Sequence, residues 1–140
     1  MKYLLPLILA AGAACAEEPV IVHPYDGNHA DALFSLENAI INQGLVVDYH
    51  SQVGEMLART REDVGGAQIF EAADVLLFCS ATVSRQVMEA DPLNVAYCPY
   101  GIFVTEREGQ VEIGYRSYPE GPMDAVEELL GAIVEEALAF

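Results

Sequence analysis

The strongest constraint on the fold is a pair of β-rich runs joined by a tight-turn signal. Residues 100–106 read YGIFVTE and residues 110–117 read QVEIGYRS, and Arg107-Glu108-Gly109 lies between them. Gly109 can supply the positive φ that a tight turn needs, so the pattern predicts a β-hairpin. A hairpin makes at least part of the sheet antiparallel.

An amphipathic helix is expected to follow this hairpin. The segment PMDAVEELLGAIVEEALAF carries glutamates on one side and an apolar stripe on the other, at helical spacing. The stripe consists of Val126, Leu129, Leu130, Ile133, Val134 and Leu138. We expect this C-terminal helix to pack on one face of the sheet.

Shorter patterns fill the chain before the hairpin. The first patterns predict a strand Val20–His23 stopped by Pro24 and a helix with Asn28 as N-cap and Gly44 as stop. A strand Leu45–Tyr49 and a short helix follow, and this helix is capped by Ser51 and ended by Gly65-Gly66. A central strand Val75–Cys79 and a helix Ser84–Ala90 ended by Pro92 complete this part of the chain. The order indicates a single small α+β domain, with a mixed or mostly antiparallel sheet and helices packed on it.

The N-terminus has the pattern of a secretory signal peptide. Lys2 precedes a short apolar stretch, and Ala14-Cys15-Ala16 is a small-residue cleavage site. We expect residues 1–16 to be removed, residues 17–140 to form the domain, and the protein to be periplasmic or secreted. Cys15 also suggests a lipid attachment site, but Gly12 occupies the position where a lipidation signal usually has Leu.

Charge restricts the class of partner. Removal of residues 1–16 leaves five arginines against 22 acidic residues, a formal net charge of −17. Such a surface repels phosphate backbones, so nucleic acid is excluded as a partner on this reasoning. No second apolar run is long enough to span a membrane, so no span is expected in the mature chain.

Cys79 and Cys98 are the two cysteines expected in the mature protein, and each lies at the end of an apolar run. An even number of thiols in an exported protein favours a disulfide. If their strands run parallel, the sulfurs lie about 16 Å apart and cannot bond; if antiparallel, they meet at one edge. Separate buried thiols, metal ligands and reactive thiols remain as alternatives.

His50 follows a predicted strand and precedes a predicted helix. It either hydrogen-bonds local backbone or acts as a ligand or acid–base group at the sheet edge. Together with Cys79, Cys98 and the Met88 thioether, it would form a soft site suited to copper(I). Met88 alone favours core packing. Tyr115 either packs the hairpin on a helix or a dimer mate, or lines a ligand pocket.

From residue 28 onward the order of features resembles the bacterial family called domain of unknown function 302. The matching segments are QGLVVDYH with His50, VLLFCSA, VMEADP with Met88 and Pro92, YCPYGIFVTE, and VEIGYRSYP with Tyr115 and Pro119. Cys79 and Cys98 occupy positions where the family usually has other residues. The resemblance implies a compact α+β domain that tends to form a homodimer, and it implies no established activity.

These patterns support three hypotheses. The first is an exported, non-enzymatic accessory domain that dimerises and binds a small ligand or a metal ion. The second is a thiol-based redox or sulfur-handling enzyme that uses Cys79 or Cys98. The third is a structural domain stapled by a Cys79–Cys98 disulfide. No familiar catalytic motif occurs, so the sequence leans away from an enzyme.

Overall fold

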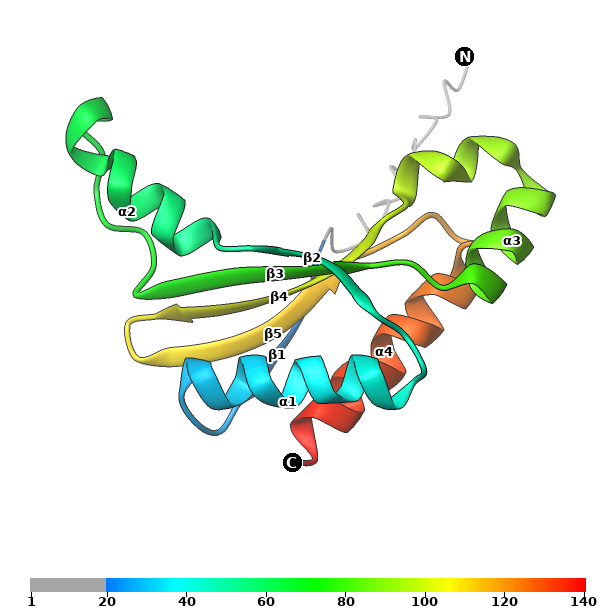
Figure 1. Ribbon diagram of the computed structural model, residues 1–140, viewed down its shortest axis with the longest axis horizontal. Helices are drawn as coiled ribbons and strands as arrows, with labels where there is room; N and C mark the ends of the chain where they lie inside the picture. Colours follow the sequence, from blue (N-terminus) through cyan, green and yellow to red (C-terminus); the bar gives the residue numbers. More distant parts are fainter. Residues whose placement is uncertain (1–19) are drawn as a thin grey trace, which may run out of the picture.

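The computed structural model describes residues 20–140 (Figure 1). The predicted signal peptide and Cys15 lie outside the described residues. The elements, in chain order, are β1 Val20–Tyr25, α1 His29–Asn42, β2 Val47–Ser51, α2 Val53–Val64, β3 Ala72–Phe78, α3 Ala81–Ala90, the 3₁₀ helix η1 Pro92–Tyr97, β4 Tyr100–Arg107, β5 Gln110–Arg116 and α4 Asp124–Leu138.

The five strands form one sheet in the order β1-β5-β4-β3-β2. Every neighbouring pair is antiparallel, including β3 and β4, which α3 and η1 connect. The predicted hairpin is confirmed as β4 and β5, with Glu108 and Gly109 at positive φ in the turn. The predicted α+β class with a mostly antiparallel sheet is therefore confirmed.

Two helices cover one face of this sheet. Figure 1 shows α1 and α4 side by side on the same side of the strands, and these helices pack against each other. The buried core lies between them and the sheet, and its largest members include Leu36, Phe78, Tyr100, Ile102 and Leu130. The predicted stripe of the C-terminal helix is confirmed by burial of Val126, Leu130, Ile133 and Val134.

Local capping explains where several elements begin. Asn28 caps α1 as predicted, because its side chain accepts a hydrogen bond from the Asp31 backbone N–H at 2.9 Å. Ser80 caps α3 in the same way, so that helix begins three residues before the predicted start. Ser51 does not cap α2: it still belongs to β2, and Gln52 occupies the cap without a side-chain hydrogen bond.

Two strand predictions need correction. Pro24 does not end β1, since β1 lies at the edge of the sheet, where a residue without an N–H is tolerated. β2 begins and ends two residues later than predicted, with an irregular register between Val47 and Tyr49. The strand predicted to be central, β3, is paired on both sides but lies one place from the edge.

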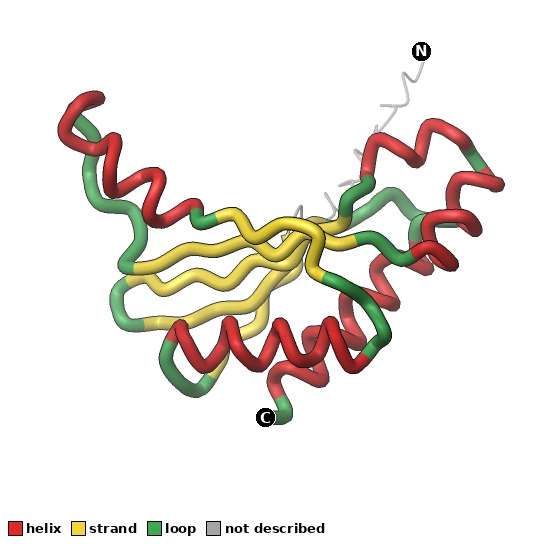
Figure 2. Tube along the Cα trace, in the orientation of Figure 1, coloured by secondary structure: helices red, strands yellow, loops and turns green. Residues whose placement is uncertain are grey.

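The opposite face of the sheet carries no helix across it in the described part of the chain (Figure 2). Val20 and Val22 point to this open face, because Ile21 between them packs on the core. Tyr49 points the same way, because it lies after the register irregularity and pairs with Leu77, whose two neighbours in β3 face the core. Val20, Val22 and Tyr49 are 40%, 42% and 62% exposed. Helix α2 stands clear of the body in Figure 1 and buries no residue. Within residues 20–140 no helix has the length and apolarity needed to cross a membrane.

The close packing around Gly114, in β5, leads to a prediction about stability. A Cβ at Gly114 would lie 2.5 Å from the Phe103 ring and 2.6 Å from the Ile21 carbonyl oxygen. Gly114→Ala should therefore lower the free energy of unfolding by about 1–3 kcal/mol, measured by urea denaturation. Gly66→Ala is the matched control, since no atom lies closer than 3.6 Å to its Cβ position. Equal stability of both variants would contradict the close packing at Gly114.

Candidate functional site

The antiparallel pairing of β3 and β4 brings the two cysteines together. Phe78 pairs with Tyr100, Cys79 directly follows Phe78, and Cys98 lies two residues before Tyr100. Both thiols are unbonded and half-buried. The alternative in which the strands run parallel and separate the sulfurs is therefore wrong.

The environment of Cys79 disfavours its thiolate. The pKa of Cys79 is raised to about 12, first by burial and then by a hydrogen bond and a charge interaction with the Cys98 side chain. The Asp48 carboxylate acts in the same direction, whereas a hydrogen bond from the Tyr100 backbone opposes the rise. Cys79 is therefore a protonated thiol at neutral pH, which makes it a poor nucleophile.

Aromatic side chains and one cation form a cluster next to the thiol pair. The Arg116 guanidinium carbon lies 5.4 Å from the ring centre of Tyr97 and 5.7 Å from that of Tyr118. Tyr97 directly precedes Cys98 in the chain. The pKa of Tyr118 is raised to about 12, mainly by burial and with a smaller contribution from Cys98. The Tyr100 hydroxyl is hydrogen-bonded to the Ser84 hydroxyl at 3.1 Å. The thiol pair thus lies beside a mostly buried polar and aromatic cluster.

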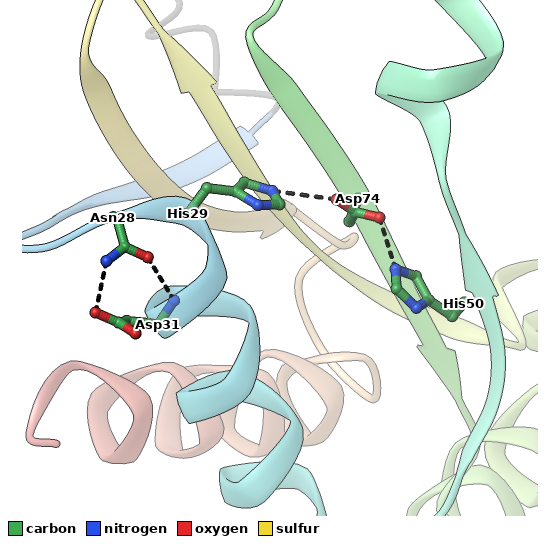
Figure 3. Close-up of polar contacts among 5 residues, drawn as sticks. All are labelled: Asn28, His29, Asp31, His50 and Asp74. Carbon is green, nitrogen blue, oxygen red and sulfur yellow. Dashed lines mark hydrogen bonds and ion pairs between the residues drawn. The ribbon is translucent and has the colours of Figure 1, made fainter.

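His50 belongs to a second cluster (Figure 3). Its Nε2 lies 2.6 Å from Oδ1 of Asp74, and Nε2 of His29 lies 3.2 Å from Oδ2 of the same carboxylate. His29 is the first residue of α1, His50 lies in β2, and Asp74 lies in β3. One carboxylate thus connects three elements on the face of the sheet that α1 covers.

The two histidines differ in exposure. The His50 side chain is 39% exposed, whereas those of His29 and Asp74 are 12% and 14% exposed. Nε2 of His29 is buried and lies 3.2 Å from Asp74 without a well-aligned hydrogen bond. When Nε2 of His50 donates to Asp74 in the neutral ring, the other ring nitrogen of His50 is a hydrogen-bond acceptor.

The predicted four-residue soft site is only partly assembled. Cys79 and Cys98 come together, but His50 pairs with Leu76 in the sheet, three positions from Cys79, and turns to Asp74 on β3.

Met88 packs against the core from α3, in keeping with the packing interpretation. Tyr115 is 5% exposed and belongs to the same core. Its hydroxyl faces Gly131 of α4, so the hairpin packs on that helix.

Metal coordination by three or more side chains finds no support in residues 20–140. No group of three His, Cys, Asp or Glu side chains in this range is arranged to hold a metal ion. A hollow of about 170 Å³ near α2 is lined by residues such as Leu57, Arg61 and Phe70 and by none of the candidate side chains.

Sequence reasoning did not identify Asp74 or His29 as partners of His50, nor Asp48 as a neighbour of Cys79. The three-way contact depends on strand register and on the position of the start of α1. The one signal available in the sequence was Asp74 itself, a carboxylate near the beginning of a strongly apolar strand, because a buried carboxylate requires a partner.

Comparison with known proteins identifies a family without supplying an activity. The family model described as "Domain of unknown function DUF302" matches residues 21–138. The chain is also similar to a solved structure of an uncharacterized conserved DUF302 protein from Bacillus stearothermophilus. That similarity has a TM-score of 0.59 and 19% identity over 84% of this chain and 86% of the other, so it supports the fold alone. No curated protein matches the chain.

The shared carboxylate makes a second stability prediction. Asp74→Ala removes the common partner of two largely buried or hydrogen-bonded imidazoles, and we expect a loss of about 1–3 kcal/mol in the free energy of unfolding. Arg85→Ala is the control, because its ion pair with Glu89 has both side chains more than two-thirds exposed and should contribute under about 0.5 kcal/mol. Urea denaturation at neutral pH measures both, and a cost for Arg85→Ala equal to that for Asp74→Ala would contradict a structural role for the cluster.

Proposed function

Because the chain belongs to the family described as domain of unknown function DUF302, which carries no assigned activity, we propose a function from the chemistry of its own side chains. The protein is an exported accessory domain that binds a soft metal ion, copper(I), through the thiols of Cys79 and Cys98. It works as a homodimer and is not an enzyme.

The contact between the two thiols carries this proposal. Cys79 follows and Cys98 precedes a paired strand position, the two side chains are hydrogen-bonded, and each residue is half-buried. Thiolates are soft ligands that select copper(I) over harder ions. Two sulfurs presented together from two paired strands offer such an ion a ligand pair without rearrangement of the sheet.

The state of Cys79 favours metal binding over thiol catalysis. A nucleophilic cysteine needs a thiolate at working pH, and the pKa of Cys79 is raised to about 12 by burial first of all. A bound metal ion supplies positive charge that replaces the thiol proton, so a protonated resting state is compatible with a ligand role. The thiol-enzyme hypothesis is therefore the weaker one for Cys79.

Export is part of the proposal and is supported by the leader pattern of residues 1–16. Copper(I) is a cation, and the mature chain has five arginines against 22 acidic residues. The resulting negative potential attracts small cations to the surface. The surface charge therefore favours capture of a metal ion over capture of an anionic ligand.

The homodimer is proposed to form through the open face of the sheet. Apolar surface is exposed there at Val20, Val22 and Tyr49. Helix α2 is 12 residues long and buries none of its residues. An isolated helix of that length is marginal in water, so a second copy that covers α2 and the open face would stabilise it.

Copper(I) titration against a chromophoric chelator tests the ligand proposal. Cys79→Ser and Cys98→Ser should each weaken copper(I) binding by more than about 100-fold, since each removes one of two ligands. His50→Ala should bind as tightly as the unaltered protein, because His50 turns to Asp74.

The pH dependence provides an independent check on the same titration. The metal displaces the Cys79 proton, so loss of this proton alone should make the affinity rise at least about tenfold per unit between about pH 6 and 8, well below the Cys79 pKa of about 12. Copper(I) binding that is independent of pH, or that survives loss of either thiol, would contradict the proposal.

Sedimentation equilibrium tests the dimer. Tyr49→Asp should dissociate it by placing a charge on the open face. Phe34→Asp is the matched control, since Phe34 is 69% exposed on α1, the helix that covers the other face. A monomeric unaltered protein, or dissociation by Phe34→Asp alone, would contradict the proposed interface.

A further inference from the structure

We propose that Cys79 and Cys98 also form a dithiol–disulfide couple, so that oxidation by an external disulfide joins the two sulfurs and closes the copper(I) site. The disulfide itself is argued from the geometry of the thiols, and its effect on metal binding rests on the proposed function. Oxidation and metal occupancy then exclude each other, because each uses both sulfurs.

The position of the thiols supports direct bonding between them. Cys79 and Cys98 lie just beyond the Phe78–Tyr100 pair, where β3 and β4 are still adjacent, and the two side chains interact directly. Neither cysteine residue is fully buried, which favours access of a small external disulfide to the pair. A disulfide would connect the ends of two strands that are already held together by their backbone pairing.

The surrounding charges assign different roles to the two sulfurs. Asp48 lies close enough to Cys79 for its negative charge to disfavour the Cys79 thiolate. That negative charge disfavours attack by the Cys79 sulfur on an external disulfide, so Cys98 is the attacking sulfur and Cys79 the resolving sulfur.

The reaction proceeds by two exchange steps. The Cys98 thiolate attacks one sulfur of an external disulfide RSSR, which forms a Cys98–SR mixed disulfide and releases RS⁻. Cys79 then gives up its proton and attacks the Cys98 sulfur, which forms the Cys79–Cys98 bond and releases the second RS⁻. Overall the protein dithiol is oxidised, RSSR is reduced to two RSH, and the two thiol protons are transferred to the products.

Glutathione disulfide is a suitable oxidant for the test. The full chain should carry Cys15→Ser, so that Cys79 and Cys98 are the remaining thiols. Incubation should remove both titratable thiols, lower the intact mass by two hydrogens without a glutathione adduct, and abolish copper(I) binding. Dithiothreitol should restore the thiols and the binding together.

Single variants in the same background test the assigned roles. Cys79→Ser should accumulate a stable glutathione adduct on Cys98, because the resolving sulfur is absent. Cys98→Ser should react at least about tenfold more slowly, since Cys79 retains its proton. Persistence of two thiols in the unaltered pair, disulfide-linked dimers, or equal rates for the two variants would overturn the proposal.

The results separate this inference from the proposed function. If the disulfide forms reversibly but the reduced protein binds no copper(I), the redox couple stands and the metal proposal fails. If the reduced protein binds copper(I) and glutathione disulfide leaves both thiols intact, the metal proposal stands and the redox couple fails.

Discussion

The register between β3 and β4 is the constraint on which the rest of the structure depends. It pairs Phe78 with Tyr100 at one end and Ala72 with Glu106 at the other. The first of these pairs brings the two cysteines together. The same register sets the position of β3, in which Asp74 lies next to the start of α1. A shift by one residue would turn Leu76 and Phe78 out of the core and separate both clusters. Burial of the apolar side chains therefore fixes the polar sites as well.

Much of the fold could be predicted from local signals. Gly109 indicated the hairpin turn, Asn28 the start of α1, and the apolar stripe of residues 126–138 the packing of α4. The predictions that failed concern boundaries where tertiary context decides, such as Pro24 within an edge strand and Ser51 within β2. Family resemblance was also correct, because residue order and spacing survive where individual residues have changed.

The sites were harder to predict because they depend on contacts between distant segments. Sequence reasoning could name Cys79, Cys98 and His50 by residue type, but it could not determine whether the strands bearing the cysteines run parallel or antiparallel. It grouped His50 with the thiols, whereas the side chain of His50 turns to Asp74 in β3. The partner of the second imidazole, His29, lies 45 residues away from Asp74 in the chain, so no local pattern could reveal it.

The two edges of the sheet have a consequence for behaviour at high concentration. β1 and β2 are the edge strands, and an unprotected edge can recruit another strand and grow into aggregates. Pro24 offers no N–H to such a strand, and the irregular register between Val47 and Tyr49 interrupts the regular spacing of β2. Each edge is therefore a poor template for fibril growth, so contacts between copies through the sheet face need not continue into strand-by-strand assembly at the edges.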